Sequence, residues 1–211
     1  MANKYAQIKD EELIRVYVPD VYTESLLGID YNQLKDRGIK LISFDMDDTL
    51  AGGLDLTLSR KIITKFELLK SEGFELMIIS NNGSKKVEKF ADDLEIEFIK
   101  NAEKPKGKCF VEAINKYNRK HNESITVKNM AHVGDSMLND VAGAKVSGVV
   151  SCLVRKESNI GGFWCAVFDK SEHELREVLK ERGIWRKHHK SGKGHDTQYY
   201  QLNEGYKRQV W

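Results

Sequence analysis

Residues 40–50 read Lys-Leu-Ile-Ser-Phe-Asp-Met-Asp-Asp-Thr-Leu, an apolar run that ends in a cluster of acids. The apolar part has the length and composition of a buried strand, which we expect over residues 40–46. The carboxylates of Asp45, Asp47 and Asp48 then fall within four positions. Beside a core, carboxylates this close repel one another unless a cation lies among them, and magnesium prefers such oxygen ligands. The alternative interpretation is an acidic turn at a strand end.

From residue 40 onward, strand-like runs alternate with helical patterns in which apolar residues recur every three or four positions. One helix between successive strands supplies the long connection that parallel strands need. The order therefore predicts an α/β fold, a doubly wound parallel sheet with helices on both faces. The expected strands are 40–46, 74–80, 96–99, 130–133 and 149–154, with a last helix near 172–182. Ligands of such sheets bind outside the carboxyl ends of the strands.

A second acidic cluster follows the fourth expected strand, where Gly134-Asp135 is followed five residues later by Asp140. Gly134 allows a close approach of the backbone to a ligand. Two acidic clusters at neighbouring strand ends are able to converge on one metal ion. The plainer alternative is that Asp135 caps a helix and that Asp140 is solvated.

Two further strand ends carry groups suited to phosphate. Ser80-Asn81-Asn82 precedes a helix and offers a hydroxyl and backbone N–H groups, although an ordinary helix cap is the simpler interpretation. After the third expected strand, Lys104 or Lys106 is available to neutralise phosphate charge, and sequence context alone separates them. Taken jointly, the four strand ends predict a metal-assisted phosphoryl-transfer site.

The four motifs resemble those of the haloacid dehalogenase (HAD) superfamily of aspartate-nucleophile phosphatases. The residues that carry this resemblance are Asp45-x-Asp47-x-Thr49, Ser80, Lys104, and Gly134-Asp135 with Asp140. More narrowly, residues 34–40, 80–82, 104–107 and 133–135 look like the YqeG family of subclass IIIA, and the resemblance spans roughly residues 16–155. One departure is Asp48, where the YqeG pattern usually carries Asn. The implied fold is a HAD-like Rossmannoid sheet.

The resemblance also implies roles for individual residues. Asp45 would attack phosphorus, and Asp47 would protonate the leaving oxygen and then activate water. The implied magnesium ligands are Asp45, Asp47 through its main-chain carbonyl, and Asp135, with Asp140 supporting that shell. The implied substrate-binding set is Thr49, Ser80, Asn81 and Lys104, in which Ser80 and Lys104 hold phosphoryl oxygens and Thr49 orients the first loop.

The spacing of the motifs indicates an uncapped site. Only 30 residues separate Thr49 from Ser80 and 23 separate Ser80 from Lys104, so neither gap has room for a large cap domain beside its helix and strand. An open site suits a large substrate or a phosphate at a membrane surface, unless an oligomer covers it. By resemblance, the specific substrate is phosphatidylglycerophosphate. The alternatives are a phosphatase acting on a nucleic acid, phosphoprotein or soluble metabolite, or a non-catalytic binding protein on the same fold.

Composition limits the remaining classes. The net charge of +2 argues against a nucleic-acid binding protein, and no nucleic-acid binding module is recognised. The chain lacks an export signal and a long apolar span, and its three cysteines are widely spaced, so we expect a cytoplasmic protein. We divide it into a phosphatase domain, residues 1–182, and a basic aromatic tail, residues 183–211. The tail has six Lys or Arg against two acids, which suits a peripheral place at the membrane, although a solvated terminus is the plainer interpretation.

Overall fold

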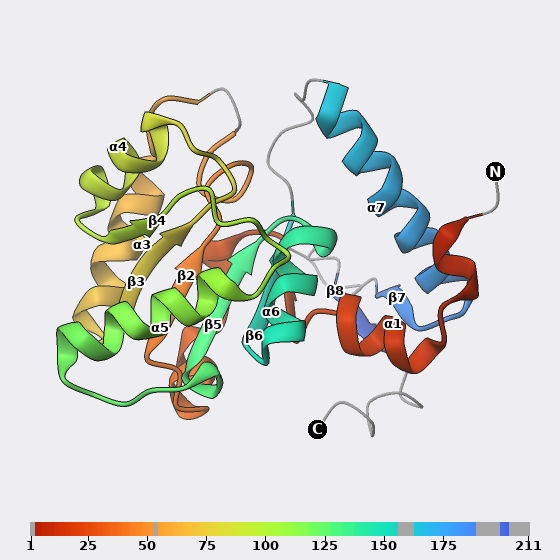
Figure 1. The fold of residues 1–211 in the computed structure, drawn as a ribbon, viewed down its shortest axis with the longest axis horizontal. Helices are drawn as coiled ribbons and strands as arrows, with labels where there is room; N and C mark the ends of the chain where they lie inside the picture. The colour runs from red at the N-terminus through yellow and green to blue at the C-terminus, as the bar shows by residue number, and fades with distance from the viewer. Residues whose placement is uncertain (1–2, 53–54, 156–162, 189–198, 203–211) are drawn as a thin grey trace, which may run out of the picture.

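The structure is a computed structural model that describes residues 3–52, 55–155, 163–188 and 199–202. Its centre is a six-stranded parallel sheet in the order β1-β6-β5-β2-β3-β4 (Figure 1). The strands are β1 (Val21–Thr23), β2 (Leu41–Phe44), β3 (Glu75–Ile79), β4 (Glu97–Ile99), β5 (Met130–Gly134) and β6 (Val150–Val154). Every residue of β2 and β5 is buried, as expected of strands covered on both faces.

The predicted doubly wound sheet is confirmed, and all five predicted strands are present with bounds that differ by up to two residues. The sixth strand, β1, was not predicted. It has three residues and pairs with β6 at one edge of the sheet. A strand this short has too little alternation for its sequence pattern to reveal it.

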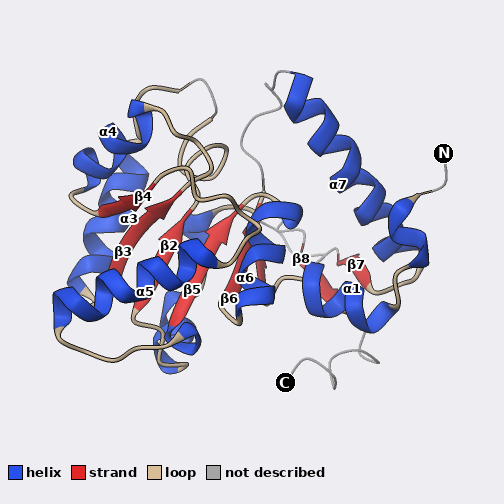
Figure 2. Ribbon diagram, viewed as in Figure 1, coloured by secondary structure: helices blue, strands red, loops and turns tan. Residues whose placement is uncertain are grey.

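Helices cover both faces of the sheet (Figure 2). On one face lie α2 (Tyr31–Asp36), α3 (Arg60–Ser71) and α4 (Lys85–Leu94), whose apolar residues share one core cluster with β2 and β3. The other face carries α5 (Lys108–His121) and α6 (Ala142–Ser147). Ser59 and Ser84 cap the amino ends of α3 and α4 by accepting backbone N–H bonds, which fixes where each helix begins after its loop.

A third cluster lies beyond the β6 side of the sheet (Figure 1). It brings the 3₁₀ turn η1 (Lys4–Gln7) and α1 (Asp10–Tyr17) together with α7 (Phe163–Glu181). The helix expected near 172–182 is therefore confirmed, although it begins earlier. Ile184 and Trp185, just past residue 182, are buried in this cluster, and the hairpin of β7 (Trp185–His188) and β8 (Tyr199–Leu202) follows. The domain division at residue 182 stays a prediction, and much of the tail lies outside the described residues.

The connections next to the motifs are short. Between Thr49 and Ser80 the described residues form α3 and β3, and between Ser80 and Lys104 they form α4 and β4. No cap domain is inserted within these described segments, as the motif spacing predicts. The remaining turns are η2 (Leu26–Gly28), η3 (Val127–Asn129) and the π-helical turn η4 (Met137–Val141). None of the helices in the described part of the chain has the length and hydropathy of a bilayer-crossing segment.

Candidate active site

A cavity of about 580 Å³ opens at the carboxyl ends of β2, β3 and β5. Residues from all four predicted motifs line it, together with residues of α7. This is the position at which parallel α/β sheets bind their ligands. Its volume lies within the range of about 300–1,000 Å³ that is typical of small-molecule sites.

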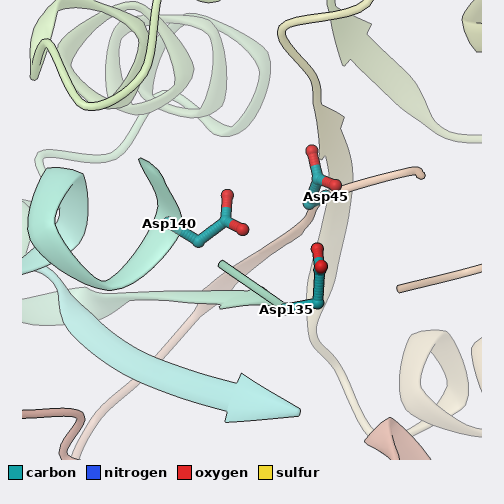
Figure 3. A group of neighbouring side chains, drawn as sticks. All are labelled: Asp45, Asp135 and Asp140. Carbon is teal, nitrogen blue, oxygen red and sulfur yellow. The ribbon is translucent and has the colours of Figure 1, made fainter. Parts of the chain in front are cut away.

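Three carboxylates converge in this cavity. Asp45 follows β2 and Asp135 follows the neighbouring strand β5, while Asp140 lies in η4 (Figure 3). One carboxylate oxygen from each lies within 4.8 Å of those of the other two. The pairing of β2 with β5 continues to this point, because the amide of Asp45 donates a hydrogen bond of 2.8 Å to the carbonyl of Val133. The predicted convergence of the two acidic clusters is thus present.

Lys104 lies inside the cluster, with its side chain 1% exposed. Its ammonium donates to Asp45 Oδ1 and to Asp140 Oδ1, both at 2.6 Å, and to the carbonyl of Ile79 at 2.8 Å. Lys106, the rival candidate, is 73% exposed and pairs with Glu103. The geometry therefore favours Lys104 as the lysine of the site.

The charges of the cluster shift one another's pKa values. Desolvation by burial raises the pKa of Asp45 from 3.8 to about 7, although Lys104 acts against this shift. Burial alone would lower the pKa of Lys104, but the carboxylates of Asp140 and Asp45 outweigh it and raise that pKa above its usual value. Burial alone would raise the pKa of Asp140, but Lys104 and His132 together hold that pKa below its usual value. Asp140 and Lys104 are therefore a charged pair at neutral pH.

Of the three carboxylates, Asp135 has the fewest donors and cations among the described residues to offset its negative charge. The Thr49 hydroxyl donates to Asp135 Oδ1 over a long distance of 3.4 Å. Burial, followed by the charges of Asp140 and Asp45, raises its pKa well above the usual value. Three carboxylates and one ammonium leave two negative charges, which one divalent cation would balance. The hard oxygen ligands therefore fit a divalent metal ion, with Asp45 and Asp135 placed to hold it.

The position of Asp140 depends on a glycine and a buried histidine. A Cβ atom built on Gly134 would lie 2.2 Å from Asp140 Cγ, so no other residue fits there without moving the carboxylate. The Ser136 amide donates to Asp140 Oδ2 at 3.0 Å. His132 Nε2 lies 3.1 Å from Asp140 Oδ1, and its Nδ1 lies 2.8 Å from Ser43 Oγ. Sequence reasoning missed His132, although a polar residue within a fully buried strand requires a partner.

Asp47 lies on the more exposed side of the cavity, with its side chain 34% exposed. The Asn82 carboxamide donates to Asp47 Oδ2 at 2.9 Å, and the Lys86 ammonium lies 3.3 Å from Asp47 Oδ1. Lys86 was not predicted as a site residue. Its position in the first turn of the helix that follows the Ser80 loop is the signal that would have found it.

The other predicted substrate-binding residues have observed partners of their own. Ser80 is buried, and its hydroxyl accepts a 3.1 Å bond from the Asn82 amide. The Asn81 carboxamide contacts the backbone of Lys104 twice, accepting from its N–H at 2.7 Å and donating to its carbonyl at 3.0 Å. Asn81 thus fixes the loop that carries the lysine. The contribution of Thr49, Ser80, Asn81 and Lys104 to substrate binding stays a prediction.

Helix α7 contributes a wall of the cavity that the sequence did not indicate. Glu172, His173 and Arg176 line it. Glu172 Oε2 accepts from the Ser136 hydroxyl at 3.2 Å and from the Met137 amide at 3.1 Å, which joins α7 to the loop after Asp135. No local pattern places a helix so far along the chain beside this loop, so only the tertiary structure reveals it.

Comparison with known proteins agrees with the sequence resemblance. Residues 6–158 match the family described as mitochondrial PGP phosphatase. A Bacillus subtilis (strain 168) protein named "Probable phosphatase YqeG" is 30% identical over 171 residues, an alignment that covers 81% of this chain and 96% of the relative.

Two solved structures are more distantly similar. A hypothetical protein from Xanthomonas campestris has a TM-score of 0.45 and 17% identity, covering 75% of this chain and 91% of its own. A 3-deoxy-D-manno-octulosonate 8-phosphate phosphatase from Moraxella catarrhalis, in complex with magnesium, phosphate and KDO, has a TM-score of 0.43 and 18% identity, covering 72% and 98%. These two likenesses are too weak to transfer a ligand or substrate. The sequence matches span most of the chain, and on them the protein belongs to the mitochondrial PGP phosphatase family, the YqeG-type phosphoric monoester hydrolases of the HAD superfamily.

Proposed function

We propose that the chain is a magnesium-dependent phosphomonoesterase that works through an aspartyl-phosphate on Asp45. The observation that carries the proposal is the buried group of Asp45, Asp135, Asp140 and Lys104, which shares one cavity with Asp47. A nucleophile, a separate acid and a positively charged anion-binding group are the parts that phosphoryl transfer by covalent catalysis requires.

In the first step, a carboxylate oxygen of Asp45 forms a bond to phosphorus while the bond from phosphorus to the ester oxygen breaks. Asp47, in its protonated form, gives its proton to the departing oxygen. In the second step, Asp47 as carboxylate takes a proton from water, and that water oxygen attacks the phosphorus of the aspartyl-phosphate. The bond to Asp45 breaks, inorganic phosphate leaves, and both carboxyl groups return to their starting states.

The surroundings of the two acids suit these different tasks. Lys104 is held beside Asp45 by two ion pairs and a carbonyl, so its charge is in place before the phosphate arrives. Asp47 is more exposed, and its oxygens face exchangeable donors, Asn82 and Lys86. Magnesium, held by Asp45, the Asp47 main-chain carbonyl and Asp135 with support from Asp140, would neutralise charge on the phosphoryl oxygens.

For the substrate, we propose phosphatidylglycerophosphate, whose terminal phosphate would enter the cavity. The support is the description of the matched family as PGP phosphatase. The uncapped cavity also suits a headgroup that stays attached to a large body, and the basic tail suits an anionic surface. Preference for a phosphorylated oligonucleotide, peptide or sugar would replace this substrate while leaving the mechanism intact.

The decisive experiment measures hydrolysis of p-nitrophenyl phosphate by wild type, Asp45→Asn and the exposed control Asp93→Asn, with magnesium or with EDTA. We expect Asp45→Asn and EDTA each to reduce the rate by about 10³-fold or more, whereas Asp93→Asn keeps the wild-type rate. Circular dichroism checks that the variants are folded. An active Asp45→Asn enzyme would remove Asp45 as the nucleophile.

Asp47→Asn separates the two steps. The p-nitrophenolate group leaves without help from an acid, so this variant should still form the covalent intermediate but hydrolyse it about 10²–10⁴-fold more slowly. Rapid mixing should therefore show a burst of p-nitrophenol, and acid-quenched protein should carry one added phosphoryl group by mass spectrometry. Slow turnover without a burst or a labelled protein contradicts the proposed role of Asp47.

A further inference from the structure

The wall of the cavity formed by α7 lies outside residues 6–158, the segment that matches the family, and the proposed mechanism does not use it. It places Arg176 and His173 in the same cavity as Asp45 and Lys104. We propose that Arg176 binds a second anionic group of the substrate, so that the enzyme selects phosphomonoesters that also carry a phosphodiester or a carboxylate. This inference rests on the proposed function and deepens it.

Arg176 is held in a defined orientation. Its Nη2 donates to Glu172 Oε1 at 2.7 Å, and the guanidinium lies over the Trp185 ring, 5.5 Å from the ring centroid. Trp185 is itself buried and makes an edge contact with Tyr22. A guanidinium carries five N–H donors, of which this bond to Glu172 uses one. A planar, oriented fork of donors is the group best suited to a phosphate or carboxylate.

Glu172 does not fully cancel the charge of Arg176. Its other oxygen, Oε2, accepts from the Ser136 hydroxyl and the Met137 amide at the amino end of η4. The negative charge of Glu172 is therefore shared between Arg176 and these two donors. The Arg176 side chain remains 35% exposed beside the cavity, where a ligand reaches it.

The charges that line the cavity favour different positions for the two anionic groups of such a substrate, the phosphate that is cleaved and the second anion. Lys104, which lies beside Asp45, serves the phosphate that is cleaved, and a divalent metal ion held by Asp45 and Asp135 would serve that same phosphate. The remaining acids of the cavity, among them Asp48 and Asp47, repel a second anion. Arg176 on the α7 wall therefore offers the favourable contact for that second group.

Three small esters test the inference without a membrane. Glycerol 3-phosphate has no second anion, 3-phosphoglycerate adds a carboxylate, and glycerophosphoglycerophosphate, the deacylated headgroup, adds a phosphodiester. In wild type, we expect at least one of the two esters that carry a second anionic group to have a higher kcat/KM than glycerol 3-phosphate. Arg176→Gln should raise KM for that ester by about 10- to 100-fold, the range of a charge-assisted hydrogen bond, with kcat nearly unchanged.

Matched variants separate recognition from folding. For glycerol 3-phosphate, Arg176→Gln should stay within about twofold of wild type. Arg176→Lys should restore part of the loss, whereas Lys180→Gln, an exposed residue one turn further along α7, should change nothing. The carboxylate and phosphodiester arms identify which anion Arg176 selects. Equal losses on all three esters, no loss on any, or no wild-type preference would overturn the inference.

Failure of the proposed function has a different signature. If wild type hydrolyses none of the esters, the phosphatase mechanism fails, and calorimetry then decides about Arg176. Titration of glycerophosphoglycerophosphate and 3-phosphoglycerate into Asp45→Asn and into the double variant with Arg176→Gln measures binding without turnover. Weaker binding of either ester to the double variant supports the second-anion site, and equal binding rejects it.

Discussion

The two sides of the cavity differ in how they hold their charges. The inner side, defined as Asp45, Lys104 and Asp140, is buried and joined by two ion pairs of 2.6 Å. The outer side, defined as Asp47, Asn82 and Lys86, makes longer contacts, and the Asp47 side chain is 34% exposed. A buried charge that loses its partner lowers the stability of the fold by several kcal/mol (about 3–5), whereas an exposed charge that loses its partner is solvated by water. The inner side is therefore a fixed framework, and the outer side is free to exchange protons with solvent.

Removing the inner ammonium should give the largest effect. Lys104→Met leaves Asp45 and Asp140 buried without their common cation, so we expect a loss of about 3–5 kcal/mol in the free energy of unfolding and no measurable phosphatase activity. Urea denaturation in EDTA measures the stability. Lys106→Met, on the same loop but exposed, should change it by less than about 1 kcal/mol. Similar losses in the two variants would show that burial does not distinguish these lysines.

The pH dependence of stability should report the burial of the inner side. In the folded protein, burial raises the pKa of Asp45 from its ordinary value of 3.8 to about 7. The folded state therefore binds more protons than the unfolded state between these values, and the stability present below about pH 4 is lost as the pH rises through 7. In EDTA, we expect the melting temperature to fall by about 5–10 °C over this window.

Variants and metal test that assignment. Asp45→Asn removes the titrating group, so its melting temperature at pH 8 in EDTA should exceed that of wild type. Asp93→Asn, whose exposed carboxylate pairs with Lys89 outside the cavity, is the control. Magnesium should stabilise wild type more at pH 8 than at pH 5, because protons compete for the same carboxylates. A wild-type stability that is flat from pH 4 to 7 would contradict the raised pKa of Asp45.

The sequence anticipated the inner side well. Parallel strands align their carboxyl ends, and β5 pairs with β2, so the acids after these two strands lie close together. The lysine after β4 reaches them across the end of β3, where it donates to the Ile79 carbonyl. Lys104 was separated from Lys106 only by the structure, because both lie in one short loop. The outer partner Lys86 was missed, since its contact with Asp47 depends on how α4 leaves its loop.

The α7 wall was missed for a different reason. Glu172 and Arg176 form an ordinary i, i+4 pair, which by itself indicates only a solvated helix face. Their place in the cavity follows from the packing of Leu175, Val178 and Leu179 in the third core cluster. Local patterns predict that such a helix is amphipathic but not where its polar face points.

A smaller disturbance of the inner side is Gly134→Ala. The added Cβ would meet Asp140 Cγ at 2.2 Å, so the carboxylate or η4 must shift. We expect a loss of about 1–3 kcal/mol in stability and a marked loss of activity at subsaturating magnesium. Gly28→Ala controls for the general cost of replacing a glycine, because its φ is not positive and the nearest atom to its Cβ position is Thr23 Cβ, at an ordinary contact distance of 3.7 Å. Retention of magnesium affinity by Gly134→Ala would argue against a role for Asp140 near the metal.

The smallest change is expected on the outer side. Lys86→Met removes the 3.3 Å ion pair to Asp47 and the bond to the Gly52 carbonyl. The Lys86 side chain is 10% exposed but Asp47 is 34% exposed, so we expect a loss of about 1 kcal/mol in stability. Turnover of p-nitrophenyl phosphate should fall by less than about tenfold, because Asn82 still holds the other oxygen of Asp47. Lys85→Met, its exposed neighbour, is the control. If Lys86→Met lost phosphatase activity as completely as Lys104→Met, the inner and outer sides would not differ in their importance for catalysis.

The carboxamide of Asn81 has a wider consequence for this architecture. Its two bonds to the Lys104 backbone reproduce the paired N–H and C=O contacts that one peptide group makes with another across a ladder. Regular pairing ends at Ile79 and Ile99, and beyond it the Ala102 amide still donates to the Ser80 carbonyl at 3.0 Å, so backbone and Asn81 side chain together register the loop against its neighbour. A segment without strand geometry is thereby fixed to the end of β3, which keeps the Lys104 amine beside Asp45.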